Sequence, residues 1–195
     1  MRVTSMKNVG AMVCLGALVL SAGAGCGDKG SGEGSGAAAS PQKPAFSDDA
    51  MAFMLGRKYA FACLYTKLDK SAEASSSIGA AQTIARALGV AEPSLPTKAD
   101  AFAALRAKGI PDSITAKKGA KVSAVYSLGV AVTDAWFGAL LGSDPKPAVA
   151  DIETYAKAAG TPESAYKTQL DAMKAKPTEE GLKTLAQALE AHYKG

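Results

Sequence analysis

From residue 47 onward, apolar side chains recur every three or four residues, the spacing that places them on one face of an α-helix. Hydroxyl residues or prolines that favour helix starts precede most of these stretches, and glycines that favour helix ends follow several. The sustained alternation typical of β-strands does not occur. The pattern predicts an all-α fold, a helical bundle of about six to seven helices in one domain, 47–195. The expected helices cover residues 47–68, 72–88, 97–109, 120–141, 144–160, 161–176 and 178–193.

One of these segments is apolar on all sides. Val122 to Leu141 spans 20 residues and carries a single charge, Asp134. This length suffices for a membrane span, but an aspartate near the bilayer centre costs about 2.5–3.5 kcal/mol. The other expected helices are amphipathic and need a partner to cover their apolar faces. We therefore expect this segment to be the central helix of the bundle, with a second membrane span as the alternative.

The chain also contains two related stretches. Leu55-Gly56 and Leu128-Gly129 lie 73 residues apart, and Gly89 and Gly160, which end shorter helices downstream, lie 71 residues apart. This spacing predicts two related helical hairpins within the bundle.

The N-terminus carries a different pattern, which ends at Cys26. Arg2 and Lys7 precede an apolar run from Val9 to Leu20, and small residues lead into Ala24-Gly25-Cys26. This arrangement resembles the signal peptide and lipobox of bacterial lipoproteins, although Gly23 stands where the family prefers a leucine-like residue. An ordinary secretory signal cleaved nearby is the alternative.

The resemblance implies that 1–25 is a signal peptide and that Cys26 becomes a lipidated N-terminus. It places the protein in the cell envelope, anchored in a membrane through Cys26. In enterobacterial lipoproteins, an aspartate directly after the lipidated cysteine acts as a retention signal. Here Gly27 holds that position and Asp28 comes one residue later, so the resemblance favours the periplasmic face of the outer membrane over the inner membrane. Residues 26–46 form a Gly/Ser/Ala/Pro-rich tether with a coil length of roughly 25 Å. The helical part is similar to helical envelope lipoproteins, and this resemblance implies no particular activity for the chain.

Charge and composition exclude several classes of function. Without Arg2 and Lys7, 20 basic residues face 18 acidic ones. This near-balance argues against a nucleic-acid partner, which favours a strongly basic surface. The single histidine excludes a two-histidine zinc motif, and phosphate-loop and serine-elbow patterns are missing. We expect no cofactor, no metal and no enzymatic activity.

Two residues could still carry chemistry. Cys63 lies in an apolar run, where a buried thiol is the favoured reading, and a nucleophilic cysteine would need His192 as its base. Asp134 occupies a costly position, because an ionised carboxylate in a helical core must be paired or must neutralise. We expect a buried polar pair with Arg57 or Lys58, with a polar handle in a ligand cavity or a surface position as alternatives.

These observations lead to one expected function and one alternative. The first is a lipid-anchored envelope protein whose non-enzymatic helical domain binds or scaffolds a partner protein. The alternative is a carrier or sensor of a small apolar ligand, held in a cavity between helices. Such a cavity would be lined by Phe61, Tyr65, Tyr126, Trp136 and Phe137.

Cys26→Ser tests the anchor. Stable attachment needs the acyl chains that the cysteine would carry, so the variant should incorporate no labelled fatty acid and remain unlipidated. The measurement is incorporation of labelled palmitate into the variant and into the parent protein, grown in parallel. Equal labelling of variant and parent would show that the lipobox assignment is wrong.

Overall fold

The computed structural model describes residues 46–195, and within this range the chain is helical and contains no strand. The predicted all-α fold is therefore confirmed. The expected signal peptide, Cys26 and the tether up to residue 45 lie outside the described residues. The elements are α1 (Asp48–Lys67), α2 (Ser71–Leu88), α3 (Ala101–Leu105), α4 (Gly109–Lys118), α5 (Ala120–Leu140), α6 (Lys146–Ala158), the 3-10 turn η1 (Glu163–Ala165), α7 (Lys167–Ala175) and α8 (Glu179–Lys194).

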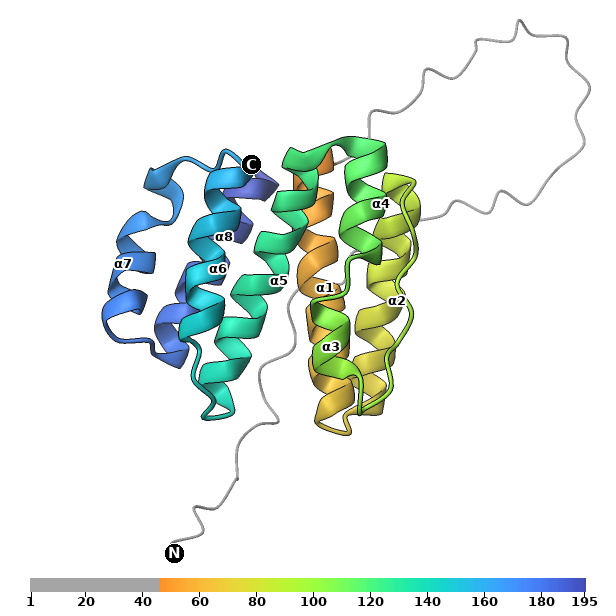
Figure 1. Ribbon diagram of the computed structural model, residues 1–195, viewed down its shortest axis with the longest axis horizontal. Coiled ribbons are helices and arrows are strands. Elements are labelled where there is room, and N and C mark those ends of the chain that lie inside the picture. The colour runs from red at the N-terminus through yellow and green to blue at the C-terminus, as the bar shows by residue number, and fades with distance from the viewer. Residues whose placement is uncertain (1–45) are drawn as a thin grey trace, which may run out of the picture. The chain divides into compact units, whose positions relative to one another are not determined.

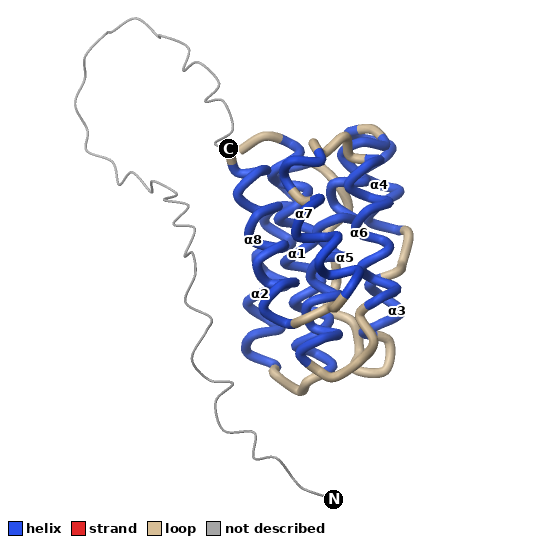
Figure 2. Tube along the Cα trace, turned by 90° about the vertical axis from the view of Figure 1, so that its left-hand side faces the viewer, coloured by secondary structure: helices blue, strands red, loops and turns tan. Residues whose placement is uncertain are grey.

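Helices α1 and α5 run side by side through the middle of the bundle (Figure 1). Helix α1 packs against α2 and α8, whereas α5 packs against α4, α6 and α8. Figure 2 shows the long helices aligned along one direction. An ion pair joins the N-terminal ends of α1 and α5, because Lys121 Nζ lies 2.8 Å from Asp49 Oδ2. Lys118, at the end of α4 just before α5, lies with its Nζ 3.1 Å from Asp48 Oδ2. The two central helices are therefore parallel.

The two central helices approach each other most closely at a pair of glycines. A Cβ atom added to Gly56 would lie 2.1 Å from the Tyr126 carbonyl oxygen, and one added to Gly129 would lie 2.4 Å from the Phe53 carbonyl oxygen. Neither distance is compatible with a side chain, because atoms in a protein interior are close-packed. Only glycine at both positions allows the two backbones to lie this close.

These two contacts are equivalent by the 73-residue shift between the halves of the chain. Gly56 faces Tyr126 while Gly129 faces Phe53, so each half makes the same contact with the other. Reciprocal contacts of this kind are the mark of an approximate two-fold axis. The next pair of glycines repeats as well: Gly89 and Gly160 end α2 and α6 with φ angles of 70° and 68°. The predicted relation between two helical hairpins thus corresponds to matching geometry.

One part of the helix prediction was wrong. The segment 97–109 was expected to form one helix ending at Gly109, but α3 covers only Ala101–Leu105, and Gly109 begins α4. Gly109 has no positive φ, so it does not form the left-handed glycine cap that ends α2 at Gly89. Pro111 lies inside the first turn of α4, where its missing N–H costs nothing. The sequence Gly109-Ile110-Pro111 fits a helix start as well as a helix end, and tertiary packing selected the start.

Helix α5 occupies the position expected of a central helix. Within residues 46–195 it is the one helix long and apolar enough to cross a membrane, and 61% of its apolar window is buried in the bundle. Val125, Leu128 and Val132 are fully buried. Contacts with α1, α4, α6 and α8 account for this burial.

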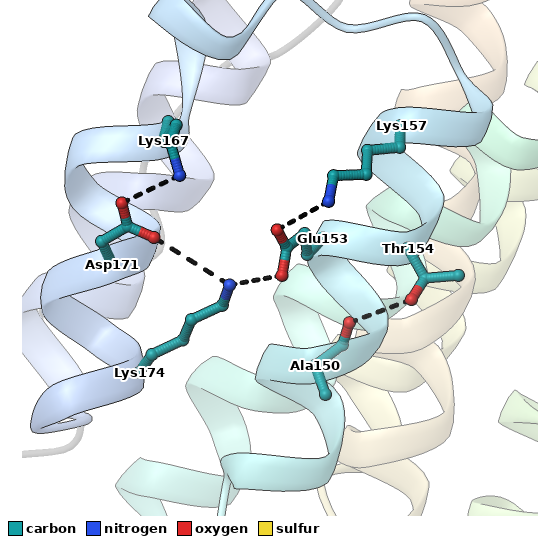
Figure 3. A network of polar contacts seen from close by, with 7 residues as sticks. All are labelled: Ala150, Glu153, Thr154, Lys157, Lys167, Asp171 and Lys174. Carbon is teal, nitrogen blue, oxygen red and sulfur yellow. Dashed lines mark hydrogen bonds and ion pairs between the residues drawn. The ribbon is translucent and has the colours of Figure 1, made fainter.

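Helix α7 lies at the outer edge of the bundle and is attached to α6 by charged side chains (Figure 3). The Lys174 ammonium donates to Glu153 and lies 3.9 Å from Asp171, while Lys157 lies 2.9 Å from Glu153. Hydrogen bonds from Lys174 and Lys157 lower the pKa of Glu153 to about 2. This network lies at the surface, so it orients α7 and contributes little to stability.

Gly56→Ala tests the close crossing of α1 and α5. Because the added methyl group would overlap a backbone carbonyl that cannot move independently, we expect a loss of about 1–3 kcal/mol or more in unfolding free energy. Chemical denaturation followed by circular dichroism measures the loss.

Gly79→Ala provides the matched control, since a Cβ atom at this position in α2 meets no atom within 4 Å. There the same substitution should stabilise the helix by about 0.5–1 kcal/mol. Similar midpoint shifts for both variants would show that the crossing does not depend on Gly56.

Candidate functional site

A pocket of about 210 Å³ opens between α3, the end of α5 and the start of α6. It combines apolar walls with three charged residues, Arg106, Asp134 and Asp144. Its apolar lining consists of Leu64, Phe102, Leu105, Leu141, Pro145, Pro147 and Ala148. Gly138, one turn after Asp134 on α5, contributes no side chain to the pocket.

Asp134 is the half-buried charge in this pocket. Burial raises the pKa of its carboxyl group, Arg106 lowers that pKa to a smaller extent, and Asp151 on α6 raises it. Among the residues that the structure describes, none forms a hydrogen bond or an ion pair with this carboxylate. Arg106 is exposed at the pocket rim, whereas Asp144 accepts a hydrogen bond from the Lys146 backbone N–H at 3.1 Å.

The predicted pair between Asp134 and Arg57 or Lys58 was wrong. The Arg57 guanidinium instead donates to Glu190 on α8. The Arg57 side chain is 12% exposed and the Glu190 side chain is 29% exposed. Burial lowers the pKa of Arg57 to about 10, and burial together with Arg57 and Lys194 lowers the pKa of Lys58. Arg57 faces α8, whereas Asp134 faces α3 and α6. The alternative reading of Asp134 as a polar group in a cavity therefore agrees with its position.

Four of the five aromatic residues expected to line a ligand cavity, Phe61, Tyr65, Trp136 and Phe137, instead pack against one another, and the fifth, Tyr126, is buried elsewhere in α5. Phe61 lies 5.5–5.9 Å, ring centre to ring centre, from Tyr65, Trp136 and Phe137. The Arg57 guanidinium carbon lies 5.5 Å from the Phe61 ring centre. The rings fill the space between them. Trp136 Nε1 is buried in this cluster without a hydrogen-bond acceptor, and the Trp136 ring packs nearly perpendicular to the Phe61 ring.

Cys63 is fully buried, as the favoured reading predicted. Burial raises the pKa of its thiol to about 11, so the reactive thiolate is scarce at neutral pH. His192 packs against Tyr193, whose ring stacks on Phe53 at 5.0 Å. Phe53 lies ten residues, roughly 15 Å, along α1 from Cys63. The structure therefore does not place a base beside the thiol.

All the exposed large apolar side chains of residues 46–195 lie at one end of the bundle. They are Leu95, Phe102, Leu140 and Leu141, each 39–45% exposed. Phe102 and Leu141 border the 210 Å³ pocket, and Leu95 borders a second pocket of about 250 Å³ with Thr66 and Lys98. This end carries the C-terminal ends of α1 and α5, opposite to Phe46. We name it the distal end.

Sequence reasoning missed Phe102, Arg106 and Gly138. Only the Leu140-Leu141 doublet before a helix-ending glycine could have signalled exposed apolar surface. Within the described residues, no group of three or more His, Cys, Asp or Glu side chains is placed to hold a metal ion.

Neither the family models, the curated proteins nor the solved structures with which the chain was compared match it. The candidate site is therefore defined by geometry and chemistry alone.

Asp134→Asn tests the electrostatics of the pocket. The raised pKa means that the ionised carboxylate destabilises the folded state above the unfolded-state pKa of about 3.9. The variant should therefore be more stable than the parent at pH 7, and the gain should fade as the pH falls below this value. Denaturation midpoints of variant and parent, measured from pH 3 to pH 8, check both the direction of the stability difference and its pH dependence.

Asp112→Asn serves as the control, because this exposed carboxylate lies in the first turn of α4. Its negative charge favours a helix N-terminus, so its loss should lower stability at pH 7 or leave it unchanged. A loss of about 3–5 kcal/mol for Asp134→Asn would instead indicate a buried ion pair.

Proposed function

We propose that this protein is a lipid-anchored binding module of the cell envelope, which presents its distal end to a partner protein. The observation that carries this proposal is the gathering of the exposed apolar side chains Leu95, Phe102, Leu140 and Leu141 at that end. Exposed apolar groups bordered by polar residues favour protein–protein contact. The proposed role is non-enzymatic.

The position of the chain entry supports this orientation. The described residues begin at Phe46, next to the N-terminal end of α1. Any anchor at Cys26 is therefore connected to the end of the bundle opposite the distal end. Helix α5 has 21 residues, so the two ends are roughly 30 Å apart. A short tether would hold the entry end near the membrane and leave the distal end free for a partner, with the outer membrane as the proposed location.

The pocket at the distal end has a composition suited to binding. Its walls are mostly apolar, and Asp134 and Arg106 add charges of opposite sign. Binding sites commonly combine an apolar lining with a few placed polar groups. The alternative of a small-molecule carrier draws less support, because Phe61, Tyr65, Trp136 and Phe137 fill the space where the cavity was expected.

A photo-crosslinking amino acid at Phe102 tests the proposal in intact cells. The same amino acid at Lys117, which is exposed at the opposite end, provides the control. We expect Phe102 to give one discrete crosslinked protein, which Lys117 does not give. A second substitution, Leu141→Asp, should reduce this product several-fold because it places a charge in the apolar contact.

Absence of any discrete product at Phe102, or the same product at both positions, would overturn the proposal. A co-purifying small molecule detected by native mass spectrometry, with no crosslinked protein, would favour the carrier.

A further inference from the structure

We infer that the pocket beside Asp134 receives a long basic side chain, lysine or arginine, from the partner protein. This inference rests on the proposed function and names the chemistry of its contact. Three observations support it: the way the two halves of the chain differ at this pocket, the charges that line it, and its size.

The pocket exists because the two halves differ at two positions. By the 73-residue shift, Asp134 corresponds to Phe61 and Gly138 corresponds to Tyr65. In the first half, Phe61 and Tyr65 stack on each other at 5.9 Å and fill the space beside α1. In the second half, a carboxylate and a glycine stand in their place, and the space beside α5 stays open. The same fold therefore closes one site and opens the other.

The charge inside the pocket is negative. Two carboxylates line it, the half-buried Asp134 and the exposed Asp144, against one cation among the lining residues, the exposed Arg106. Of the neighbouring charges, Arg106 lowers the pKa of Asp134 and Asp151 raises it to a smaller extent. The Asp134 carboxylate has no hydrogen-bond donor among the described residues, so a cationic group from outside would supply one. A hydrogen bond between a cationic donor and a carboxylate is stronger than one between neutral groups.

The size and walls of the pocket suit one side chain. Its 210 Å³ exceeds the cavity of about 150 Å³ that holds a benzene molecule, and falls below the roughly 300–1,000 Å³ of typical drug-sized ligand sites. Leu64 and Leu105 would contact the aliphatic stem of a basic side chain, which buries its methylene groups against apolar surface. The Phe102 ring already accepts a cation, since Lys67 Nζ lies 5.4 Å from its centre.

Peptide binding to the full-length protein, held in a supported bilayer by its own anchor, tests the inference. The probes are acetyl-Ala-Lys-Ala-amide and versions with arginine, norleucine or glutamate at the central position. Norleucine keeps the stem of lysine and lacks the ammonium group. A bilayer without protein gives the background. We expect the lysine or arginine peptide to bind about tenfold or more tightly than the norleucine peptide, the change that one charged hydrogen bond gives.

Two variants locate the binding. Asp134→Asn keeps the shape of the side chain and removes its charge, so it should weaken basic-peptide binding about tenfold. Gly138→Phe should block the pocket, because a Cβ atom there meets only Pro145, at 3.7 Å, and leaves room for a ring to enter. Gly79→Phe, in open space on α2, is the matched control and should leave binding unchanged. Circular dichroism of each variant establishes that it is folded.

The outcomes separate this inference from the proposed function. Equal binding of norleucine and basic peptides, or unchanged binding by Asp134→Asn, would overturn the inference while a crosslink at Phe102 still supports a protein partner. If free n-butylamine binds as tightly as the lysine peptide and Phe102 gives no crosslink, a protein partner is overturned and the pocket binds a free amine.

Discussion

The contact on which the rest of the fold depends is the crossing of α1 and α5 at Gly56 and Gly129. Each glycine lies against a backbone carbonyl of the other helix, at a distance that leaves no room for a methyl group. Close backbone approach of this kind permits Cα–H to carbonyl contacts and buries both helices along their length. The packing of α2, α8, α4 and α6 follows from it, because each of these helices packs against one or both of the central helices.

The approximate two-fold relation explains why one site is filled and another is open. Where both halves keep the same residues, as at the leucine–glycine pairs, the two halves make the same contact. Where they differ, at Phe61 and Asp134 and at Tyr65 and Gly138, one half builds an aromatic cluster and the other leaves a pocket. The two halves thus share one frame, in which one copy of a position fills the space with aromatic rings while the other copy leaves a pocket open.

The two ends of the bundle differ in their chemistry. At the end where the described chain begins, Lys118 and Lys121 pair with Asp48 and Asp49, so these charges balance one another. At the distal end, apolar side chains are exposed around a pocket that holds the half-buried carboxylate of Asp134. Surface ion pairs contribute little free energy, whereas exposed apolar area favours association. The two ends therefore differ: charges are paired at the end where the described chain begins, and apolar side chains are exposed at the distal end.

Local sequence determined the elements of this protein. Helical periodicity, the caps at Ser47 and Thr178, and the glycines that end α2 and α6 identified the all-α class and most helices. The spacing of the leucine–glycine pairs indicated the related hairpins. The periodicity, caps and helix-ending glycines are readable because they depend on neighbours within about one helical turn, and the hairpins because the same short pattern occurs twice. The short segment around Gly109 was the exception, since its signals fit a helix start and a helix end equally well.

Only the tertiary structure decided the partners of the charged residues and the position of the pocket. Arg57 pairs with Glu190, which is 133 residues away in sequence, and not with Asp134. The pocket brings α3, α5 and α6 together, and its opening depends on the absence of a side chain at Gly138. Which faces of two helices meet depends on how their backbones cross, and the glycines at the crossing set that angle and distance. Pairings across such an interface have no local signal, because the energy that selects them arises only when the whole bundle is packed.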